Sequence, residues 1–504
     1  MDNSDPRARL SWWALMGTHY RLDAGNWLGS ARGWPRHPEV GMFPDYTTRR
    51  PAGLQPVVGR FSGEKRYYDF HGRFDKVRDP RPLEEWDPET VDEDLRDVLE
   101  TRRDKSPETA RDDVEVVPGK DYHGAVLAAM EKGIDLVWLT GGVNYREENA
   151  IEFLLAKKGA CFKDGLYEMA RAFNTGVFAG KPITIYWEIG NEVNSSNRFS
   201  LRNLAPGKHL RGDPRHGRDY IEYYFAPAVE ALRTASRDLF DNERGIQIIL
   251  GSISGIHKEA NQKFLDFILS QTIEGRHAPA LAGRHVYEVI DAVTLHYSMG
   301  DRSVLEEIYA RWLESGKVAN LWTTEELGRR GRGDYNVALV AFRWLDFWAR
   351  HGWGSRHRGR VIFWGDDLEH PACATTGRSA EALLGDFLRD YPLTQAKNVD
   401  VTVETAADVE WYALRAEAGS TGTRYAVCLH PHVEAQSALR YVELRGVATA
   451  DSVAVDAKRI RANQPTESLT ARTIESDQGV RIGFAKHELH PMELIVVLVT
   501  VDAH

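Results

Sequence analysis

The stretch ITIYWEIGNEVN, residues 183–194, begins as an apolar strand and ends in a cluster of carboxylates and amides. Its first residues favour a β-strand because Ile and Thr are β-branched. The polar part begins at Glu188, and a second carboxylate, Glu192, follows four residues later. In a barrel of parallel strands, functional side chains collect at the carboxyl ends of the strands. The stretch therefore predicts a barrel strand whose polar end lies at the mouth of the barrel.

Segments of this kind alternate with helix-like segments from about residue 120 onwards. Such alternation is typical of βαβ units and a parallel sheet. The expected strands are 11–20, 65–74, 133–142, 182–192, 246–255, 289–298, 318–328 and 360–369. Eight strands alternating with helices predict an α/β fold of the (β/α)8 TIM-barrel type.

The pattern changes after about residue 395, where short alternating segments are separated by Gly, Asn, Asp and Ser. This pattern is typical of an antiparallel β-sandwich. We therefore expect two domains, a catalytic barrel at 1–394 and a β-sandwich at 395–504. A charged segment at 75–118 is either a helix on the outside of the barrel or a flexible insertion, and the helical spacing of its apolar residues favours the helix.

Composition and charge argue against several classes of partner. The net charge is −10, so no overall basic field exists to hold nucleic-acid phosphates. Only three cysteines are present, far apart, which disfavours both a disulfide framework and a cysteine metal site. The apolar run Trp12–Met16 is too short for a signal peptide or a membrane span. We expect no membrane partner and a cytoplasmic protein, or a secreted or periplasmic one if a signal peptide has been removed.

Polar side chains end most of the predicted barrel strands. The candidates are His19 on the first strand, Asn144 after the third, Asn191 and Glu192 on the fourth, His296 and Tyr297 on the sixth, Glu325 and Glu326 on the seventh, and Trp364, Asp366 and Asp367 on the eighth. Because all these strand ends meet at one face of a barrel, we expect the residues to line one pocket.

Two of these strand ends carry carboxylates that would face each other across the barrel mouth, Glu192 and Glu325. A retaining glycosidase needs such a pair about 5–5.5 Å apart, one protonated and the other ionised. The interval between them leaves room for the three βα units that the topology requires. The acid would need a raised pKa, which the charge of Glu325 and partial burial would give to Glu192.

The motifs WEIGNE (187–192) and LWTTEELG (321–328) resemble clan A of the glycoside hydrolases, in which Asn-Glu ends strand four and Glu ends strand seven. The Gly-Asn-Glu form and the trailing sandwich are similar to the β-xylosidase/α-L-iduronidase, α-L-arabinofuranosidase and heparanase-like branches. The resemblance implies retaining hydrolysis of O-glycosidic bonds in an oligosaccharide or polysaccharide, with no metal and no cofactor. It makes Glu192 the general acid/base and Asn191 the amide that binds the sugar 2-hydroxyl.

The nucleophile has two candidates. The form Trp-x-Ser/Thr-Glu selects Glu325, whereas the form Glu-x-Gly selects Glu326, and adjacent strand residues point to opposite faces, so only one can face inward. We favour Glu325 and expect the other carboxylate to pair with an Arg, such as those in 328–334. Tyr297 resembles the clan's tyrosine whose hydroxyl contacts the nucleophile, with His296 as the alternate.

The other strand-end residues would have supporting roles. Trp364 would form the floor of the sugar subsite by stacking, and Asp366 and Asp367 would bind sugar hydroxyls. His19 and Asn144 would line the pocket. Each of these five, taken singly, is equally compatible with packing or with a hydrogen bond at a strand end.

Some alternatives stay open. A metal-dependent barrel hydrolase is the rival enzyme, although the chain has no HExxH motif and its strand ends carry Glu more often than His. A non-catalytic carbohydrate-binding barrel is the rival outside the enzymes. Glu188 shares a strand face with Glu192 and is expected to be a structural residue one layer down, paired with an Arg. The sequence does not specify the sugar, its anomeric configuration or charge, exo or endo action, or the oligomeric state.

Overall fold

The structure, a computed structural model, describes residues 16–21, 58–62, 135–139, 184–194, 214–326, 334–353, 359–364 and, with short gaps, 391–502, together with isolated residues at 159–174 and 384–388. The charged segment at 75–118, for which a helix is expected, lies outside these residues.

Eight parallel strands pair in a ring. They are β1 (Met16–Arg21), β2 (Val58–Ser62), β3 (Asp135–Leu139), β4 (Ile185–Ile189), β5 (Gln247–Leu250), β7 (Ala292–His296), β8 (Asn320–Glu326) and β9 (Val361–Trp364). Each pairs with the next, β9 pairs with β1, and β5 pairs with β7 through Ile249 and Ala292. The two-residue strand β6 (Ile253–Ser254) adds to β7. This order fits the expected (β/α)8 barrel.

The second strand of the ring lies upstream of its expected place. We expected it at 65–74, but the strand that pairs between β1 and β3 is β2, at Val58–Ser62. That segment contains the β-branched Val58 and the aromatic Phe61 and lies between Pro56 and Gly63, which are residues that often flank strands. The expected position was therefore wrong. Residues 65–74 themselves lie outside the described part of the chain.

Helices lie in the described connections from β4 to β9. They are α8 (Pro214–Tyr220), η7 (Ile221–Phe225), α9 (Ala226–Phe240), α10 (Glu259–Ser270), η8 (Pro279–Leu281), α11 (Val286–Val289), α12 (Arg302–Ile308), η9 (Tyr309–Leu313) and α13 (Asp334–His351). Their buried residues share one core with the outward-facing strand residues, such as Trp187, Val293 and Leu321. No described helix is both long enough and apolar enough to cross a membrane.

The inside of the ring has an apolar layer with a polar layer next to it. Val137, Ile249, Ala292, Trp322 and Ile362 form the apolar layer. Two residues further along β7 and β8 come the buried polar side chains Thr294 and Thr324. On β4, the buried Glu188 lies two residues beyond Tyr186, which packs against the apolar layer. Because side chains alternate along a strand, these residues share the inner face with the apolar layer. The polar layer therefore lies at the carboxyl ends of the strands, where a barrel carries its functional groups.

The C-terminal region forms two antiparallel sheets. The six-stranded sheet has the order β10 (Leu393–Gln395), β12 (Val409–Glu417), β13 (Thr423–Pro431), β19 (Glu493–Val501), β15 (Val453–Arg461), β16 (Glu467–Leu469). The four-stranded sheet has the order β11 (Val401–Thr405), β14 (Ser437–Arg445), β18 (Gly479–Leu489), β17 (Ala471–Ser476). Apolar side chains from both sheets form one shared cluster.

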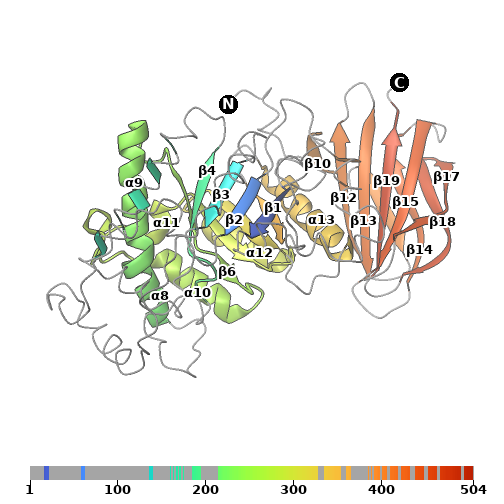
Figure 1. The fold of residues 1–504 in the computed structure, drawn as a ribbon. Coiled ribbons are helices and arrows are strands. Elements are labelled where there is room, and N and C mark those ends of the chain that lie inside the picture. Colours follow the sequence, from blue (N-terminus) through green and yellow to red (C-terminus); the bar gives the residue numbers. More distant parts are fainter. Residues whose placement is uncertain are drawn as a thin grey trace.

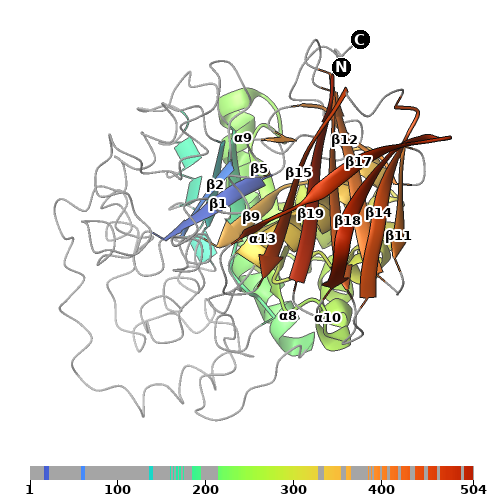
Figure 2. The same cartoon turned by 90° about the vertical axis from the view of Figure 1, so that its right-hand side faces the viewer.

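The six-stranded sheet lies between the four-stranded sheet and the barrel. Figure 1 shows helix α13 between the barrel strands and the orange and red sheets. In Figure 2 the four-stranded sheet faces the viewer, in front of the six-stranded one. Along β19, Ile495 and Val497 join the cluster between the sheets, whereas Val496 and Leu498 join the core of the barrel helices. The unbroken apolar run of β19 follows from burial on both faces.

Candidate active site

The end of β4 turns sharply and carries its carboxylate in a strained conformation. Glu192 has a φ of 49°, in the left-handed region that a non-glycine residue enters only at a cost of about 1–3 kcal/mol. Its side chain is 11% exposed. Such strain collects at functional sites, and a surrounding structure must hold it in place.

The segment that follows β5 supplies this support. The Ser252 carbonyl accepts from Val193 N at 2.9 Å, and the Ser252 hydroxyl accepts from Glu192 N at 3.0 Å. The side-chain amide of Asn194 also binds this segment: its Nδ2 donates to Ser254 O and its Oδ1 accepts from Ser254 N, both at 2.9 Å. The Ser252 hydroxyl also contacts Asn191 Oδ1 at 3.4 Å. The Asn-Glu turn is therefore fixed by main-chain and side-chain bonds from one neighbouring segment.

Helix α8 supports the same turn from outside. The Tyr220 hydroxyl donates to Ile189 O at 2.6 Å and accepts from Gly251 N at 3.2 Å. Burial raises the pKa of Tyr220 well above its usual value, so the phenol keeps the hydrogen that it donates.

A bulge in the β7–β8 pairing sets the direction of the two adjacent glutamates. Leu295 pairs with Thr323, but His296 pairs with Glu325, so β8 contains one extra residue at this point. As a result the Glu325 carboxylate lies at the barrel mouth. The Glu326 carboxylate accepts instead from Ser298, from Met299 N and from Trp344 on α13. The expected Arg segment at 328–334 lies outside the residues whose side chains are described.

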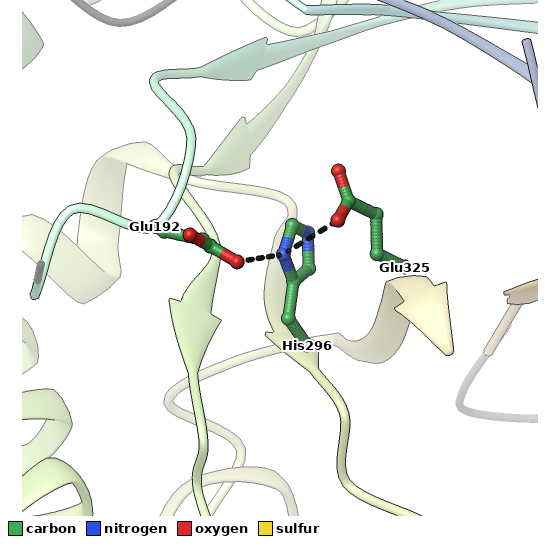
Figure 3. Close-up of side chains that lie close together, drawn as sticks. All are labelled: Glu192, His296 and Glu325. Carbon is green, nitrogen blue, oxygen red and sulfur yellow. Dashed lines mark hydrogen bonds and ion pairs between the residues drawn. The ribbon is translucent and has the colours of Figure 1, made fainter. Parts of the chain in front are cut away.

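Glu192 and Glu325 meet at a single imidazole. His296 Nδ1 lies 3.4 Å from Glu192 Oε1 and 3.5 Å from Glu325 Oε2 (Figure 3). The Tyr297 hydroxyl donates to Glu325 Oε2 at 2.7 Å. His296 is fully buried, and the Glu325 side chain is 5% exposed. Two nearly buried carboxylates from opposite sides of the mouth are thus held around one nitrogen atom.

The other ring nitrogen of His296 contacts the polar layer below it. His296 Nε2 lies 3.1 Å from Thr324 Oγ1, and Thr324 donates to Glu188 Oε1 at 3.0 Å. Because the single hydroxyl hydrogen goes to the carboxylate, Thr324 accepts from His296 Nε2–H. Nδ1 therefore faces the two carboxylates, and a proton on Nδ1 or on one carboxyl oxygen satisfies these contacts. Glu188 is a buried member of this layer, with a threonine hydroxyl among its partners, and the expected pairing with an Arg stays a prediction.

The same three side chains have the composition of a metal site. One ligand atom from each of Glu192, His296 and Glu325 lies within 4.8 Å of the others. Two carboxylates and an imidazole suit a divalent transition metal. Within the described residues, Glu192, His296 and Glu325 are the one group of three or more His, Cys, Asp or Glu side chains placed closely enough to hold a metal ion.

The structure brings most of the described candidates together. Asn191, Glu192, His296, Tyr297 and Glu325 converge at the mouth. His19 pairs with Trp364 across β1 and β9, which places both at the same end of the ring, although only their backbones are described. The remaining candidates, Asn144, Asp366 and Asp367, lie outside the described residues.

Sequence reasoning missed the hydroxyl residues that support the site, Ser252, Thr324 and Ser298. Thr324 lies inside the motif that selects Glu325, and Ser252 lies near the end of the predicted fifth strand, 246–255. Their position at the ends of predicted strands was the feature of the sequence from which a role in the site could have been predicted. It was too weak because small hydroxyl residues also end strands that carry no function.

No family model matches the sequence, and no curated protein does. Among solved structures, the chain is similar to a glucosidase from Croceicoccus marinus, with 13% identity, 98% of each chain covered and a TM-score of 0.42. It is also similar to a family 51 α-L-arabinofuranosidase from Bifidobacterium longum, with 12% identity, 98% of this chain and 97% of that chain covered, and a TM-score of 0.41. A third similar structure is a family 44 xyloglucanase from Paenibacillus polymyxa, with 10% identity, 76% of this chain and 84% of that chain covered, and a TM-score of 0.39. Likenesses this distant do not establish the activity of this chain.

Proposed function

We propose that this chain is a retaining glycoside hydrolase that cleaves O-glycosidic bonds of an oligosaccharide or polysaccharide with two glutamates. The observation that carries the proposal is the spacing of Glu192 and Glu325, which have carboxylate oxygens within 4.8 Å of one another. Retaining enzymes hold their carboxyl groups about 5–5.5 Å apart, whereas inverting enzymes hold them about 6.5–9.5 Å apart to admit a water. The short spacing favours direct attack by one carboxylate.

In the proposed reaction Glu192 donates a proton to the glycosidic oxygen while Glu325 attacks the anomeric carbon. Tyr297 and His296 both contact Oε2 of Glu325, so we assign the attack to Oε1. The resulting glycosyl-enzyme is hydrolysed when Glu192 takes a proton from water, which returns the product with its original configuration. The contact from Ser252 to Asn191 Oδ1 supports an amide whose Nδ2 binds the sugar 2-hydroxyl.

The proposal assigns the reaction to the barrel region, 1–394, and a packing role to the sheets at 395–504, which we propose to be a β-sandwich. His19 and Trp364, opposite each other on β1 and β9, would line the sugar subsite. The strand-end residues Asn144, Asp366 and Asp367 are proposed to complete that subsite.

A panel of aryl glycosides tests the activity. One of them should be hydrolysed, and its early product should keep the anomeric configuration of the substrate by NMR. Glu192→Gln and Glu325→Gln should each abolish the turnover. Binding of sugars without turnover of any glycoside would instead support a carbohydrate-binding barrel, and an inverted product would exclude double displacement.

A 2-deoxy-2-fluoro glycoside of the same sugar tests the nucleophile, because it slows the second step and traps the glycosyl-enzyme. Mass spectrometry of the labelled peptide should place the sugar on Glu325. A label on Glu326 would reverse the assignment, and the adjacent positions are distinguished by fragment ions.

A metal-dependent hydrolase is the second candidate, and the group Glu192, His296 and Glu325 favours it. Ligands of a tetrahedral ion with bonds of about 2.0–2.1 Å lie about 3.3 Å apart, close to the 3.4 and 3.5 Å contacts of His296 Nδ1. The carboxylate mechanism is preferred because Tyr297 already donates to Oε2 of Glu325, the oxygen that would bind the ion. Dialysis against a chelator should leave the turnover unchanged; loss of activity, restored by one divalent metal, would support the metal enzyme.

A further inference from the structure

The turn that carries Tyr297 adopts the left-handed backbone conformation at three of its four residues. Tyr297, Met299 and Gly300 have φ values of 54°, 55° and 61°, all in the left-handed region. Two of the three are not glycine, and a residue with a side chain is strained in this conformation. A turn of this kind keeps its shape only if contacts from outside hold it. Its shape matters because its first residue donates a hydrogen bond to Glu325.

Glu326 holds this turn from the side of β8. It is fully buried, and its carboxylate accepts from the Ser298 hydroxyl at 2.5 Å and from Met299 N at 2.8 Å. Hydrogen bonds to a buried carboxylate are stronger than those between neutral groups. The second glutamate of the pair therefore has a structural task next to the first.

Arg343 on helix α13 holds the same turn through the main chain of the turn. Its Nη1 donates to Met299 O at 3.1 Å. The backbone of Gly300 packs so closely on it that a Cβ at Gly300 would lie 2.6 Å from Arg343 Cβ. The guanidinium can bind there only if its long side chain is kept in one rotamer, and fixing such a chain costs conformational entropy.

A residue of the C-terminal sheets fixes that rotamer. Arg343 Nη2 donates to Glu410 Oε2 at 2.8 Å, and the two side chains are only 17% and 16% exposed. Glu410 lies near the start of β12 in the six-stranded sheet. A partly buried pair of this kind is screened less by water and salt than a surface pair.

We propose that Glu410 is a positioning residue for the active site. Through Arg343 it holds the 297–300 turn, and the turn places the Tyr297 hydroxyl on Glu325. The C-terminal sheets then contribute to turnover and do more than cover the barrel. The catalytic part of this inference rests on the proposed glycosidase function, whereas the contact from Glu410 to the turn does not.

The kinetic test is a double-mutant cycle. Glu410→Ala should lower kcat about 10-fold with KM nearly unchanged, because the tyrosine hydroxyl acts on the nucleophile and not on substrate binding. Tyr297→Phe should also lower kcat, and the double variant should lose no more than Tyr297→Phe alone, since both changes remove one interaction. Fully additive losses would overturn the proposal.

Gln395→Ala is the matched control. Gln395 on β10 donates to Asp346 on the same helix α13 at 2.8 Å, so it also links the sheets to the barrel, but this contact does not reach the turn. The variant should keep the kcat of the parent protein. An equal fall of kcat in Gln395→Ala would assign the effect to general loosening of the interface and would overturn the role of Glu410.

NMR of the methionine methyl groups detects changes in the 297–300 turn in the absence of substrate. The chain has 7 methionines, and the Met299 signal can be assigned with Met299→Leu. That signal should shift or broaden in Glu410→Ala and in Arg343→Lys, and stay in place in Gln395→Ala. If Glu410→Ala does not fold, Glu410→Gln should give a smaller change of the same kind.

The two readouts separate this inference from the proposed function. A Met299 signal that moves in a protein that hydrolyses no glycoside would support the link to the turn and reject the glycosidase. An unmoved Met299 signal in an active enzyme would reject the link and keep the glycosidase.

Discussion

Thr323 and Thr324 are neighbours on β8 and are both fully buried, but their hydroxyls have different surroundings. Thr324 contacts Glu188 and His296, and it also lies 2.8 Å from the Thr294 hydroxyl. Within the part of the chain that the structure describes, the Thr323 hydroxyl has no hydrogen-bond partner. Replacing Thr by Val removes the hydroxyl at nearly constant shape, so the two positions separate the effect of hydrogen bonds from that of packing.

Thr324→Val should lower kcat about 10- to 100-fold, because a buried Nε2–H of His296 left without an acceptor costs about 1–3 kcal/mol and frees the ring to turn. Thr324→Ser keeps the hydroxyl and should keep most of the turnover. Nitrogen NMR of labelled histidine should detect the Nε2–H form in the parent protein and its loss in Thr324→Val. A similar fall of kcat in Thr323→Val would contradict the role assigned to this hydroxyl.

Among single residues, the sequence motifs singled out acidic and aromatic side chains as candidates and did not single out the hydroxyls. Glu192, Glu325 and Tyr297 stand in motifs with a chemical reason for each residue type, and the structure brings them together. Ser252 and Thr324 act through contacts between strands that are far apart in the sequence. Such contacts depend on the relative register of β4, β5, β7 and β8, which side-chain alternation within one strand does not determine.

The bulge on β8 is the element that distinguishes the two adjacent glutamates. Trp322 and Thr324 both face the inside of the ring. Strict alternation from them would turn Glu326 inward and Glu325 outward. The extra residue opposite Leu295 and His296 reverses this, and Glu325 reaches the mouth. Motif resemblance favoured Glu325 before any register was known, but alternation alone would have favoured the other residue.

Gly251, between β5 and β6, is the place where the support of the β4 turn is most tightly packed. A Cβ there would lie 2.3 Å from Ile189 O and 2.8 Å from the Tyr220 hydroxyl. Gly251→Ala should therefore lower the free energy of unfolding by about 1–3 kcal/mol and lower kcat as well, because the strand end that carries Glu192 must shift. Urea unfolding and kcat measure the two effects.

Gly483→Ala is the control for this change. Gly483 lies on β18, and the nearest atoms to an added Cβ there are 3.9 Å away. Its unfolding free energy and kcat should stay close to those of the parent protein. Full activity in Gly251→Ala would show that the 189–194 segment tolerates displacement and would weaken the link between its position and function.

Across the whole molecule, the six-stranded sheet joins two cores. Val496 and Leu498 pack with the barrel helices, while Ile495 and Val497 pack with the four-stranded sheet. The change of pattern predicts a boundary near residue 395; the last barrel strand, β9, ends at Trp364, and β10 of the six-stranded sheet begins at Leu393. The sequence did not predict that β19 would be buried on both faces, because periodicity alone does not distinguish a continuous apolar run in a buried strand from one in a buried helix.

This shared packing predicts that the barrel and the sheets unfold together. Val496→Thr places a hydroxyl in the core between α13 and the sheet, at a cost of roughly 1–3 kcal/mol, and it should lower the melting temperature of the whole molecule. Loss of activity, which reports the barrel, and loss of the β-sheet circular dichroism signal should shift together in one transition. Ile474→Thr, at a position that is 57% exposed, should shift neither. The contrary result would be two separate transitions, of which Val496→Thr shifts only the transition seen in the sheet signal. The sheets would then fold as an independent unit, and the contact from Glu410 to the active site would form only after both parts have folded.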